Sequence, residues 1–295
     1  MKPVRKAVLP VAGLGTRVLP GTKTVAKELL NVVDRPILSY VVAEARAAGI
    51  EHFVFVTGRG KQAIEDYFDH HIELEAQLKA KGKVELLEEI LSELPKAGEM
   101  SFVRQMQPLG LGHAVWCARD IIGDEPFAVM LPDMLMQGPT PPLAQAVKAH
   151  EQTGGNIIVV EPCAPGEAHK YGIVALEGQN GRLNRMTGMV EKPAPGSEPS
   201  NLFISGRYVL EPEIFGILEA QEKGAGGEIQ LTDAMARLIG VQPFHGYRFD
   251  GKRYDCGDKL GFLEANIAFA LRRPELAGKL REAMLTLLDL PGSKT

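Results

Sequence analysis

A loop near the N-terminus is the first segment whose residue types could do chemistry. Residues Ala7 to Leu30 read AVLPVAGLGTRVLPGTKTVAKELL and combine two close glycines with three cations, namely Gly13, Gly15, Arg17, Lys23 and Lys27. Glycines leave backbone N–H groups open to a ligand, and such groups bind phosphate together with cations. The loop therefore indicates either a polyphosphate site or an ordinary glycine turn with surface lysines, and taken alone it does not separate the two.

The loop departs from the dinucleotide-binding fingerprint. That fingerprint continues with a third small residue into a helix, whereas this chain has Val18 at that position and Pro20 where the second helical turn would lie. Asp34, at a plausible distance for a ribose contact, follows another loop and not a second strand. An NAD-dependent oxidoreductase is therefore disfavoured.

The loop also departs from the P-loop of nucleotide hydrolases. Gly21 is followed by Thr22, so that Lys23 lies one residue out of register with the P-loop lysine. We expect instead a long loop after a first strand, with exposed N–H groups and cations along it.

Composition narrows the class of protein. The 295 residues are 45% hydrophobic and 24% charged, with a formal net charge of -4, which is ordinary for a globular protein and gives no support to nucleic-acid or membrane binding. Three distant cysteines without CxxC spacing disfavour a zinc site or a disulfide framework. No signal peptide or membrane span is apparent, so we expect a cytoplasmic protein.

Apolar runs alternate with helical patterns over the first half of the chain. Buried strands are predicted at residues 6–12, 52–58, 101–105, 126–133 and 156–162, and helices at 36–49, 61–68, 112–122 and 141–154. This order predicts a Rossmann-like α/β fold, with an open, mostly parallel (mixed) central sheet covered by helices on both faces.

The second half of the chain has a different pattern. Segments 171–177, 181–192 and 202–210 are strand-like with few helices between them, and we expect added mixed or antiparallel strands that form a wall of the site within a β region of about 165–210. Helices are predicted at 212–221 and 228–240, a strand pair at 244–257, and C-terminal helices over about 258–290. We expect residues 1–295 to form a single domain.

A leucine- and charge-rich segment, about residues 71–94, does not fit the alternating pattern. We interpret it as a solvated helical hairpin that leaves the sheet, in preference to an oligomer contact or a lid.

Five segments resemble, in order, the sugar-1-phosphate nucleotidyltransferases, and most closely their bacterial uridylyltransferase branch. The N-terminal loop is similar to the family signature G-x-G-T-R-x(6-10)-P-K, and it is followed by QPLGLGHAV, LPDMLM, YGIV with VEKP, and YDCGDKLG. The resemblance covers nearly the whole chain. Ala26 and Asn31 stand where the family usually has proline, whereas Lys27 is kept.

The resemblance implies a reaction and its partners. A phosphate oxygen of glucose 1-phosphate attacks the α-phosphorus of UTP, and UDP-glucose and pyrophosphate form with the help of Mg²⁺. Because the nucleophile is already an anion, no general base is needed, and the protein supplies cations and alignment. The resemblance also implies a homo-oligomer, a dimer or a tetramer. Thymidylyl transfer, a different sugar phosphate and a non-catalytic nucleotide-sugar sensor are the alternatives.

The resemblance implies roles for the charged residues of these segments. Arg17 and Lys27 would bind the triphosphate, with Lys23 a weaker candidate. Asp133, after a wholly apolar run, and Asp255 would be ligands of Mg²⁺. Asp258 fits an N-cap of the next helix.

The remaining candidates concern the base and the sugar. The nucleotide would contact Ala12, Gly13, Gly15, Gln107 and Gly112, with Gln107 reading the uracil edge. The sugar and its phosphate would contact Gly172, Glu191, Lys192 and Asn201, with Arg207 a weaker candidate. His113 is interpreted as a capping or structural histidine in preference to an acid or base.

Overall fold

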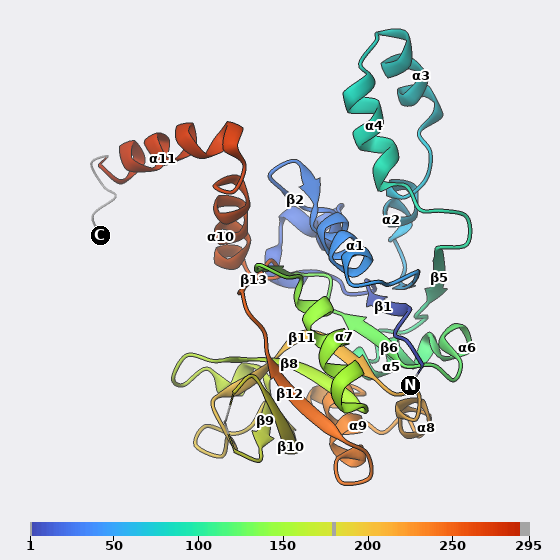
Figure 1. The fold of residues 1–295 in the computed structure, drawn as a ribbon, viewed down its shortest axis with the longest axis vertical. Coiled ribbons are helices and arrows are strands. Elements are labelled where there is room, and N and C mark those ends of the chain that lie inside the picture. Colours follow the sequence, from blue (N-terminus) through green and yellow to red (C-terminus); the bar gives the residue numbers. More distant parts are fainter. Residues whose placement is uncertain (1, 179–180, 290–295) are drawn as a thin grey trace.

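A nine-stranded mixed sheet runs through the centre of the protein, in a computed structural model that describes residues 2–178 and 181–289 (Figure 1). Four neighbouring strands at one edge are parallel, as the βαβα pattern predicts. In spatial order they are β5 (Met100–Arg104), β4 (His52–Thr57), β1 (Lys6–Pro10) and β6 (Phe127–Met130). Their carboxyl ends face one edge of the sheet, where ligands of open α/β sheets bind.

The other half of the sheet is largely antiparallel, so the prediction of a mostly parallel sheet holds only for the first half of the chain. It continues with β11 (Leu202–Leu210), β8 (Asn156–Pro162), β12 (Phe244–Arg248), β10 (Leu183–Glu191) and β9 (Gly172–Leu176). β11 runs antiparallel to both β6 and β8. No crossover helix lies between β8 and β11 in the described residues, and parallel neighbours need such a crossover.

Both faces of the sheet are covered by helices. Side chains alternate along β1, so that Ala7 and Leu9 pack with α1 (Ile37–Ala47) and α7 (Pro142–Thr153), and Val8 packs on the opposite face. That opposite face is covered by α5 (Leu111–Cys117), α8 (Ile214–Leu218) and α9 (Leu231–Leu238).

Two predicted elements are divided in the structure. The helix expected over 112–122 breaks at Ala118 into α5 and α6 (Arg119–Ile122). The strands expected over 244–257 form, but they do not pair with each other: β12 joins the central sheet, and β13 (Lys252–Asp255) pairs with β7 (Met134–Gln137) in a two-stranded sheet. Strand propensity is local, whereas the choice of partner depends on long-range packing.

Two helical segments project from the sheet layers (Figure 1). Near residues 71–94, α3 (Ile72–Ala80) and α4 (Val84–Glu93) form the predicted helical hairpin, which follows the short α2 (Gln62–Tyr67). To the left in the same view, α10 (Lys259–Ala270) and α11 (Pro274–Leu288) also extend away from the sheet. The short hairpin of β2 (Asn31–Val32) and β3 (Arg35–Pro36) contacts α10 through β2. No helix within the described ranges is long and apolar enough to span a bilayer.

Candidate active site

The N-terminal loop is not helical, as its sequence predicts. Three single 3₁₀ turns replace a helix, at Thr16–Val18, Gly21–Lys23 and Lys27–Leu29. Gly15 has a φ of 67°, a conformation that glycine adopts readily, and its carbonyl accepts a hydrogen bond of 2.7 Å from the Thr22 hydroxyl. Gly15 therefore shapes the turn that carries the cations.

This loop forms one wall of a cavity of about 430 Å³ at the carboxyl ends of β1 and β6. Residues from the loop, from the end of β5, from α5 and from the turn after β6 line it, and they include Ala12, Gly13, Arg17, Lys27, Gln105, Gly110, Asp133 and Glu228. The cavity thus joins the predicted phosphate-binding cations to a predicted metal ligand.

Two cations and two carboxylates form a cluster here, in which Arg17, Lys27 and Asp133 line the cavity and Asp255 lies beside Arg17. Lys27 Nζ lies 2.6 Å from Asp133 Oδ2, and the Arg17 guanidinium lies 3.5 Å from an oxygen of Asp133 and 3.5 Å from an oxygen of Asp255. Arg17 is more than half exposed, whereas Asp133 is buried. A mobile, exposed guanidinium beside a fixed carboxylate is suited to gripping an incoming phosphate.

The protonation of this cluster follows from burial and charge. Burial alone would raise the pKa of Asp133, but the charge of Lys27, its hydrogen bond and the charge of Arg17 hold that pKa below its ordinary value. Burial, together with the negative charge of Asp133, raises the pKa of Asp255. Asp133 is therefore the carboxylate that stays ionised as the pH falls.

Strand pairing places the two carboxylates side by side. In the β7–β13 ladder Asp255 pairs with Met134, the residue after Asp133, and the Cys256 N–H donates to the Asp133 carbonyl at 2.8 Å. Asp133 and Asp255, which are far apart in the sequence, are thus brought next to each other.

Gly257 keeps the space between the two carboxylates open. A Cβ at this position would lie 2.7 Å from Asp133 Oδ2 and 3.0 Å from Asp255 Oδ1. The described residues contain no cluster of three or more histidine, cysteine or acidic side chains that could hold a metal, so the protein offers two carboxylates here. Mg²⁺ is usually held by one or two carboxylates together with substrate phosphates and water, and the residues present fit that requirement.

A buried ion pair lies directly behind Lys27. Lys61 Nζ donates to Glu28 Oε2 at 2.7 Å, both residues are buried, and Glu28 Oε1 has no hydrogen-bond partner in the described residues. Burial raises the pKa of Glu28 despite the charge of Lys61. Glu28 follows Lys27 in the same 3₁₀ turn, and Lys61 lies in the segment after β4. The ion pair therefore anchors the turn that carries Lys27 to that segment.

Removing the cation of this pair is expected to destabilise the fold. Lys61→Met should lower the free energy of unfolding by about 3–5 kcal/mol at pH 8, because a buried charge loses its partner. The carboxyl concerned is Glu28, whose pKa is raised in the folded protein. A group of this kind favours folding below its unfolded pKa and ceases to do so as the pH rises. The loss of stability in Lys61→Met should therefore become smaller toward pH 5.

Denaturant unfolding at both pH values measures this effect, with the exposed Lys81→Met as the matched control. Equal stabilities of the two variants would contradict the role of the pair.

The glutamine that lines the cavity is Gln105, not Gln107. Gln105 is buried and its amide nitrogen donates to the Gly110 carbonyl at 3.1 Å, whereas Gln107 is exposed and is not among the lining residues. Gly112 also lies outside the lining, since its N–H bonds to the Ile229 carbonyl and a Cβ there would lie 2.8 Å from that oxygen. Gly112 thus serves helix packing.

The predicted sugar residues come from paired strand ends. Glu191, at the end of β10, pairs with Gly172 at the start of β9, and a Cβ on Gly172 would lie 3.0 Å from Glu191 Oε2. The Thr232 hydroxyl donates to the same oxygen at 2.8 Å. This leaves Glu191 Oε1 available to a ligand hydroxyl.

Lys192 turns back toward Glu191 despite the alternation expected along a strand. Its φ is 46°, in the left-handed region, and its Nζ lies 3.9 Å from Glu191 Oε1. Asn201 is exposed, and its carbonyl accepts a hydrogen bond from Cys163. Arg207 is excluded from ligand contact because it is fully buried, where it pairs with Glu44 at 2.7 Å.

Comparisons with known proteins identify the family of this chain. The family model described as "Nucleotidyl transferase" matches residues 6–270. The chain belongs to this family. It is 50% identical over 289 residues to the UTP–glucose-1-phosphate uridylyltransferase of Bacillus subtilis, across 98% of this chain and 99% of that protein. The predicted resemblance is thereby confirmed.

Solved structures of the same kind superpose closely on this nucleotidyl transferase. The UTP-bound UGPase from Acinetobacter baumannii has a TM-score of 0.90 and 43% identity, over 96% of this chain and 99% of that one. A UDP-glucose pyrophosphorylase complexed with UDP-glucose has a TM-score of 0.80 and 40% identity, over 92% and 100%.

The structure places further polar side chains near the candidate site that the sequence does not indicate. Arg253 donates to Glu161 at 3.1 Å, lies 4.0 Å from Asp255 and stacks over the ring of Phe203, which links the acidic cluster to the wall that carries Gly172. The sequence of its segment, FDGKRYDCG, predicts strands and points to Asp255, but it gives no separate signal for Arg253. Thr232 and Gln105 also gave no signal, because neither type is diagnostic in a single sequence.

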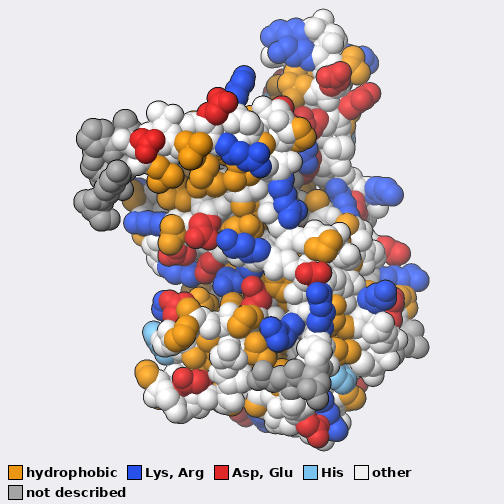
Figure 2. Space-filling model, turned by 60° about the vertical axis from the view of Figure 1, so that its left-hand side comes forward, with side chains coloured by type: hydrophobic (Ala, Val, Ile, Leu, Met, Phe, Trp, Pro, Cys, Tyr) orange, Lys and Arg blue, Asp and Glu red, His pale blue; other side chains and the backbone are white. Residues whose placement is uncertain are grey.

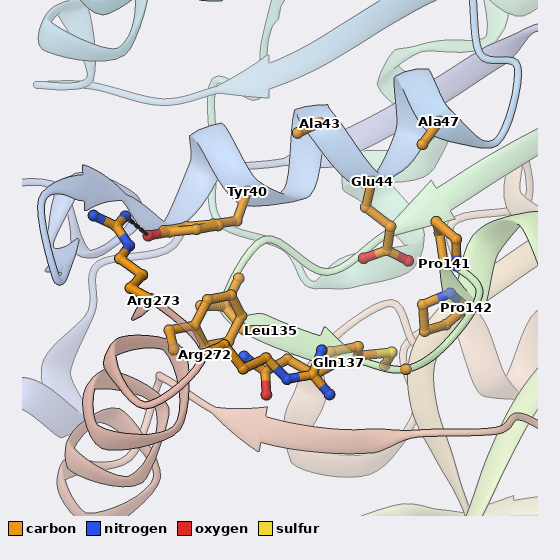
Figure 3. Close-up of a pocket in the computed structure, with 13 residues that line it drawn as sticks. Tyr40, Ala43, Glu44, Ala47, Leu135, Gln137, Pro141, Pro142, Arg272 and Arg273 are labelled. Atoms are coloured by element: carbon orange, nitrogen blue, oxygen red, sulfur yellow. Dashed lines mark hydrogen bonds between the residues drawn. The ribbon is translucent and has the colours of Figure 1, made fainter. Parts of the chain in front are cut away.

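A second cavity, of about 440 Å³, lies between α1, β7 and the end of α10 (Figure 3). Its charged groups are mostly paired: Arg273 binds Asp34 and donates to the Tyr40 hydroxyl, and Glu44 binds Arg207. Asp34 is thus occupied by an arginine, contrary to the ribose contact that a dinucleotide site needs. The candidate active site is therefore the first cavity, where the glycine loop and Asp133 meet.

Proposed function

We propose that this protein transfers the uridylyl group of UTP to glucose 1-phosphate, forming UDP-glucose and releasing pyrophosphate. The observation that carries the proposal is the cluster of Arg17, Lys27, Asp133 and Asp255 beside the glycine loop, in which the first three line one cavity and Asp255 lies next to Arg17. The names of the relatives and the UTP- and UDP-glucose-bound structures support it.

In this proposal the cations hold the reacting phosphates together. Arg17 and Lys27 neutralise the triphosphate, and Lys192, at the end of β10, binds the phosphate of the sugar. A phosphate oxygen attacks the α-phosphorus, the bond to the bridging oxygen of the β-phosphate breaks, and that oxygen leaves with the pyrophosphate. The attacking oxygen is anionic, so alignment and charge neutralisation suffice without a base.

Asp133 and Asp255 are the residues that would hold Mg²⁺, in the space that Gly257 leaves open. Bound there, the ion would act as a Lewis acid and orient the two phosphates.

The base and sugar are held by the remaining walls of the site. Ala12, Gly13 and Gln105 surround the base, with Gln105 in the role first assigned to Gln107. Glu191 accepts hydrogen bonds from sugar hydroxyls, while Gly172 makes room for the ring and Asn201 remains a candidate contact.

A substrate survey tests the reaction. Pyrophosphate release is measured with four nucleoside triphosphates and several sugar 1-phosphates, with Mg²⁺ and with a chelator. We expect turnover with UTP and glucose 1-phosphate that the chelator abolishes. No turnover with any pair would refute an enzyme and favour a nucleotide-sugar sensor, and preference for dTTP would make the protein a thymidylyltransferase.

We also propose that the protein forms a dimer or a tetramer through its C-terminal helices. Large apolar side chains on α10 recur at helical spacing on one face and are exposed, namely Leu260, Leu263 and Ile267, and no residue described on α11 is buried. Figure 2 shows hydrophobic side chains gathered over this region.

Light scattering measures the mass in solution, and we expect a multiple of 32.0 kDa that Leu263→Glu reduces. A monomeric parent protein would contradict this assembly.

A further inference from the structure

The amide of Gln105 is held in one orientation by two acceptors. Its nitrogen lies 3.1 Å from the Gly110 carbonyl oxygen and 3.0 Å from His113 Nδ1. A carbonyl oxygen only accepts hydrogen bonds, so the amide nitrogen, and not the amide oxygen, must face Gly110. Both amide hydrogens are then engaged, and the second requires His113 Nδ1 to be an unprotonated acceptor.

This arrangement leaves a single group of Gln105 for a ligand. The amide oxygen Oε1 has no partner within the described residues, and the side chain lines the 430 Å³ cavity. An oxygen acceptor fixed at a cavity wall recognises a base that presents an N–H. Uracil and thymine present N3–H, whereas the corresponding N3 of cytosine is itself an acceptor and would repel Oε1.

We propose that His113 is a positioning residue that fixes the Gln105 amide, and that it thereby sets the preference of this site for a base with an N3–H donor over cytosine. The inference rests on the proposed function for the identity of the nucleotide. It goes further by assigning base discrimination to a residue that does not touch the base.

The placement of His113 fits this indirect role. His113 is not among the residues that line the cavity, and its ring packs against Trp116 at a centroid distance of 6.0 Å on the same helix. Its other neighbour at Nδ1 is the Cys117 sulfur at 3.8 Å, a weaker partner than an amide. Burial lowers the pKa of His113, which favours the neutral ring that the amide needs. In this proposal His113 is a structural histidine, as the sequence predicts, whose function is to orient Gln105.

Without His113 the amide is held by the Gly110 carbonyl alone. One hydrogen bond of the pair is lost, and an alternative rotamer that turns the nitrogen toward the cavity becomes accessible, in which Gln105 donates to an acceptor such as N3 of cytosine. Sites built around a fixed hydrogen bond discriminate through the unpaired polar group that a wrong ligand leaves.

Two variants of His113 separate positioning from packing. His113→Phe keeps a ring against Trp116 but has no acceptor, and His113→Asn retains an acceptor oxygen near the place of Nδ1. His113→Ala replaces the Phe variant if that protein does not fold. Each variant is checked by thermal unfolding, and kcat and KM are measured separately for UTP and CTP with glucose 1-phosphate.

We expect the Phe variant to reduce the UTP-to-CTP ratio of kcat/KM about tenfold, mainly through KM, and the Asn variant to restore most of it. An unchanged ratio, or an equal loss for both nucleotides that Asn does not rescue, would overturn the proposal.

Direct binding distinguishes this proposal from the proposed reaction. Calorimetric titration with UTP and CTP alone requires no turnover. Selective UTP binding that depends on His113, with no product from glucose 1-phosphate, would refute the reaction and support the positioning role. The opposite outcome is turnover with UTP and a preference for UTP over CTP that is the same in all variants. It would support the reaction and refute the positioning role.

Discussion

Asp133→Asn is expected to reduce Mg²⁺-dependent turnover by about 10³-fold while the protein stays folded. The substitution keeps the size and the hydrogen-bonding shape of the side chain but removes its charge. Asp133 is buried and its pKa is held low by Lys27 and Arg17 against the effect of burial, so its charge is present at neutral pH. The substitution therefore removes the negative charge that would bind the metal and that pairs with Lys27.

Three measurements accompany this variant. Pyrophosphate release gives the turnover, calorimetry gives the affinity for UTP with and without Mg²⁺, and circular dichroism with thermal unfolding reports the fold. Asp124→Asn is the matched control, because Asp124 is an exposed aspartate that pairs only with Lys2. Turnover of the Asp133 variant within tenfold of the parent would remove Asp133 from the metal site.

Gly257→Ala is expected to reduce turnover by about 10²-fold through a single added methyl group. The new Cβ would lie 2.6 Å from Arg17 Nη2, 2.7 Å from Asp133 Oδ2 and 3.0 Å from Asp255 Oδ1. Arg17 is long and exposed and moves aside readily, whereas the two short carboxylates are held beside each other by the β7–β13 ladder and by the hydrogen bond from the Cys256 N–H to the Asp133 carbonyl. They must separate, and a displacement of reacting groups on this scale costs about this much in rate.

The backbone of Gly257 does not require glycine, since its φ lies outside the left-handed region. Any loss in Gly257→Ala therefore arises from the site. Gly278→Ala is the control, because a Cβ on that glycine of α11 meets nothing within 4 Å. The activity of both variants is measured across a range of Mg²⁺ concentrations. An unaltered Mg²⁺ dependence in the Gly257 variant would show that the space beside this residue is not used.

Local features of the chain predicted the elements that position the site. The βαβα order and the breaking effect of Pro20 correctly predicted the parallel half of the sheet and the non-helical loop. Asp258 caps α10 as expected, by accepting from the N–H groups of Leu260 and Gly261. Such features depend on neighbours within a few residues, which a sequence displays directly.

Partner choice was predicted less well. Segment 244–257 forms the two predicted strands, but the prediction that they pair with each other is wrong. Arg207, a weaker candidate for a sugar contact, is instead buried in an ion pair with Glu44. In each case the outcome depends on residues at least 60 positions away in the chain. A single sequence carries no record of such contacts.

The sequence by itself determined the chemistry of this protein: a glycine loop with cations, an aspartate after an apolar strand, and a family resemblance that the comparisons confirm. Only the tertiary structure decided which of two neighbouring glutamines lines the cavity, that Gly257 separates the two carboxylates, and that Lys61 and Glu28 support Lys27. The physical reason is that residue type sets what a side chain is able to bind. Burial and distance, which arise when strands from remote segments pack, set what it does bind.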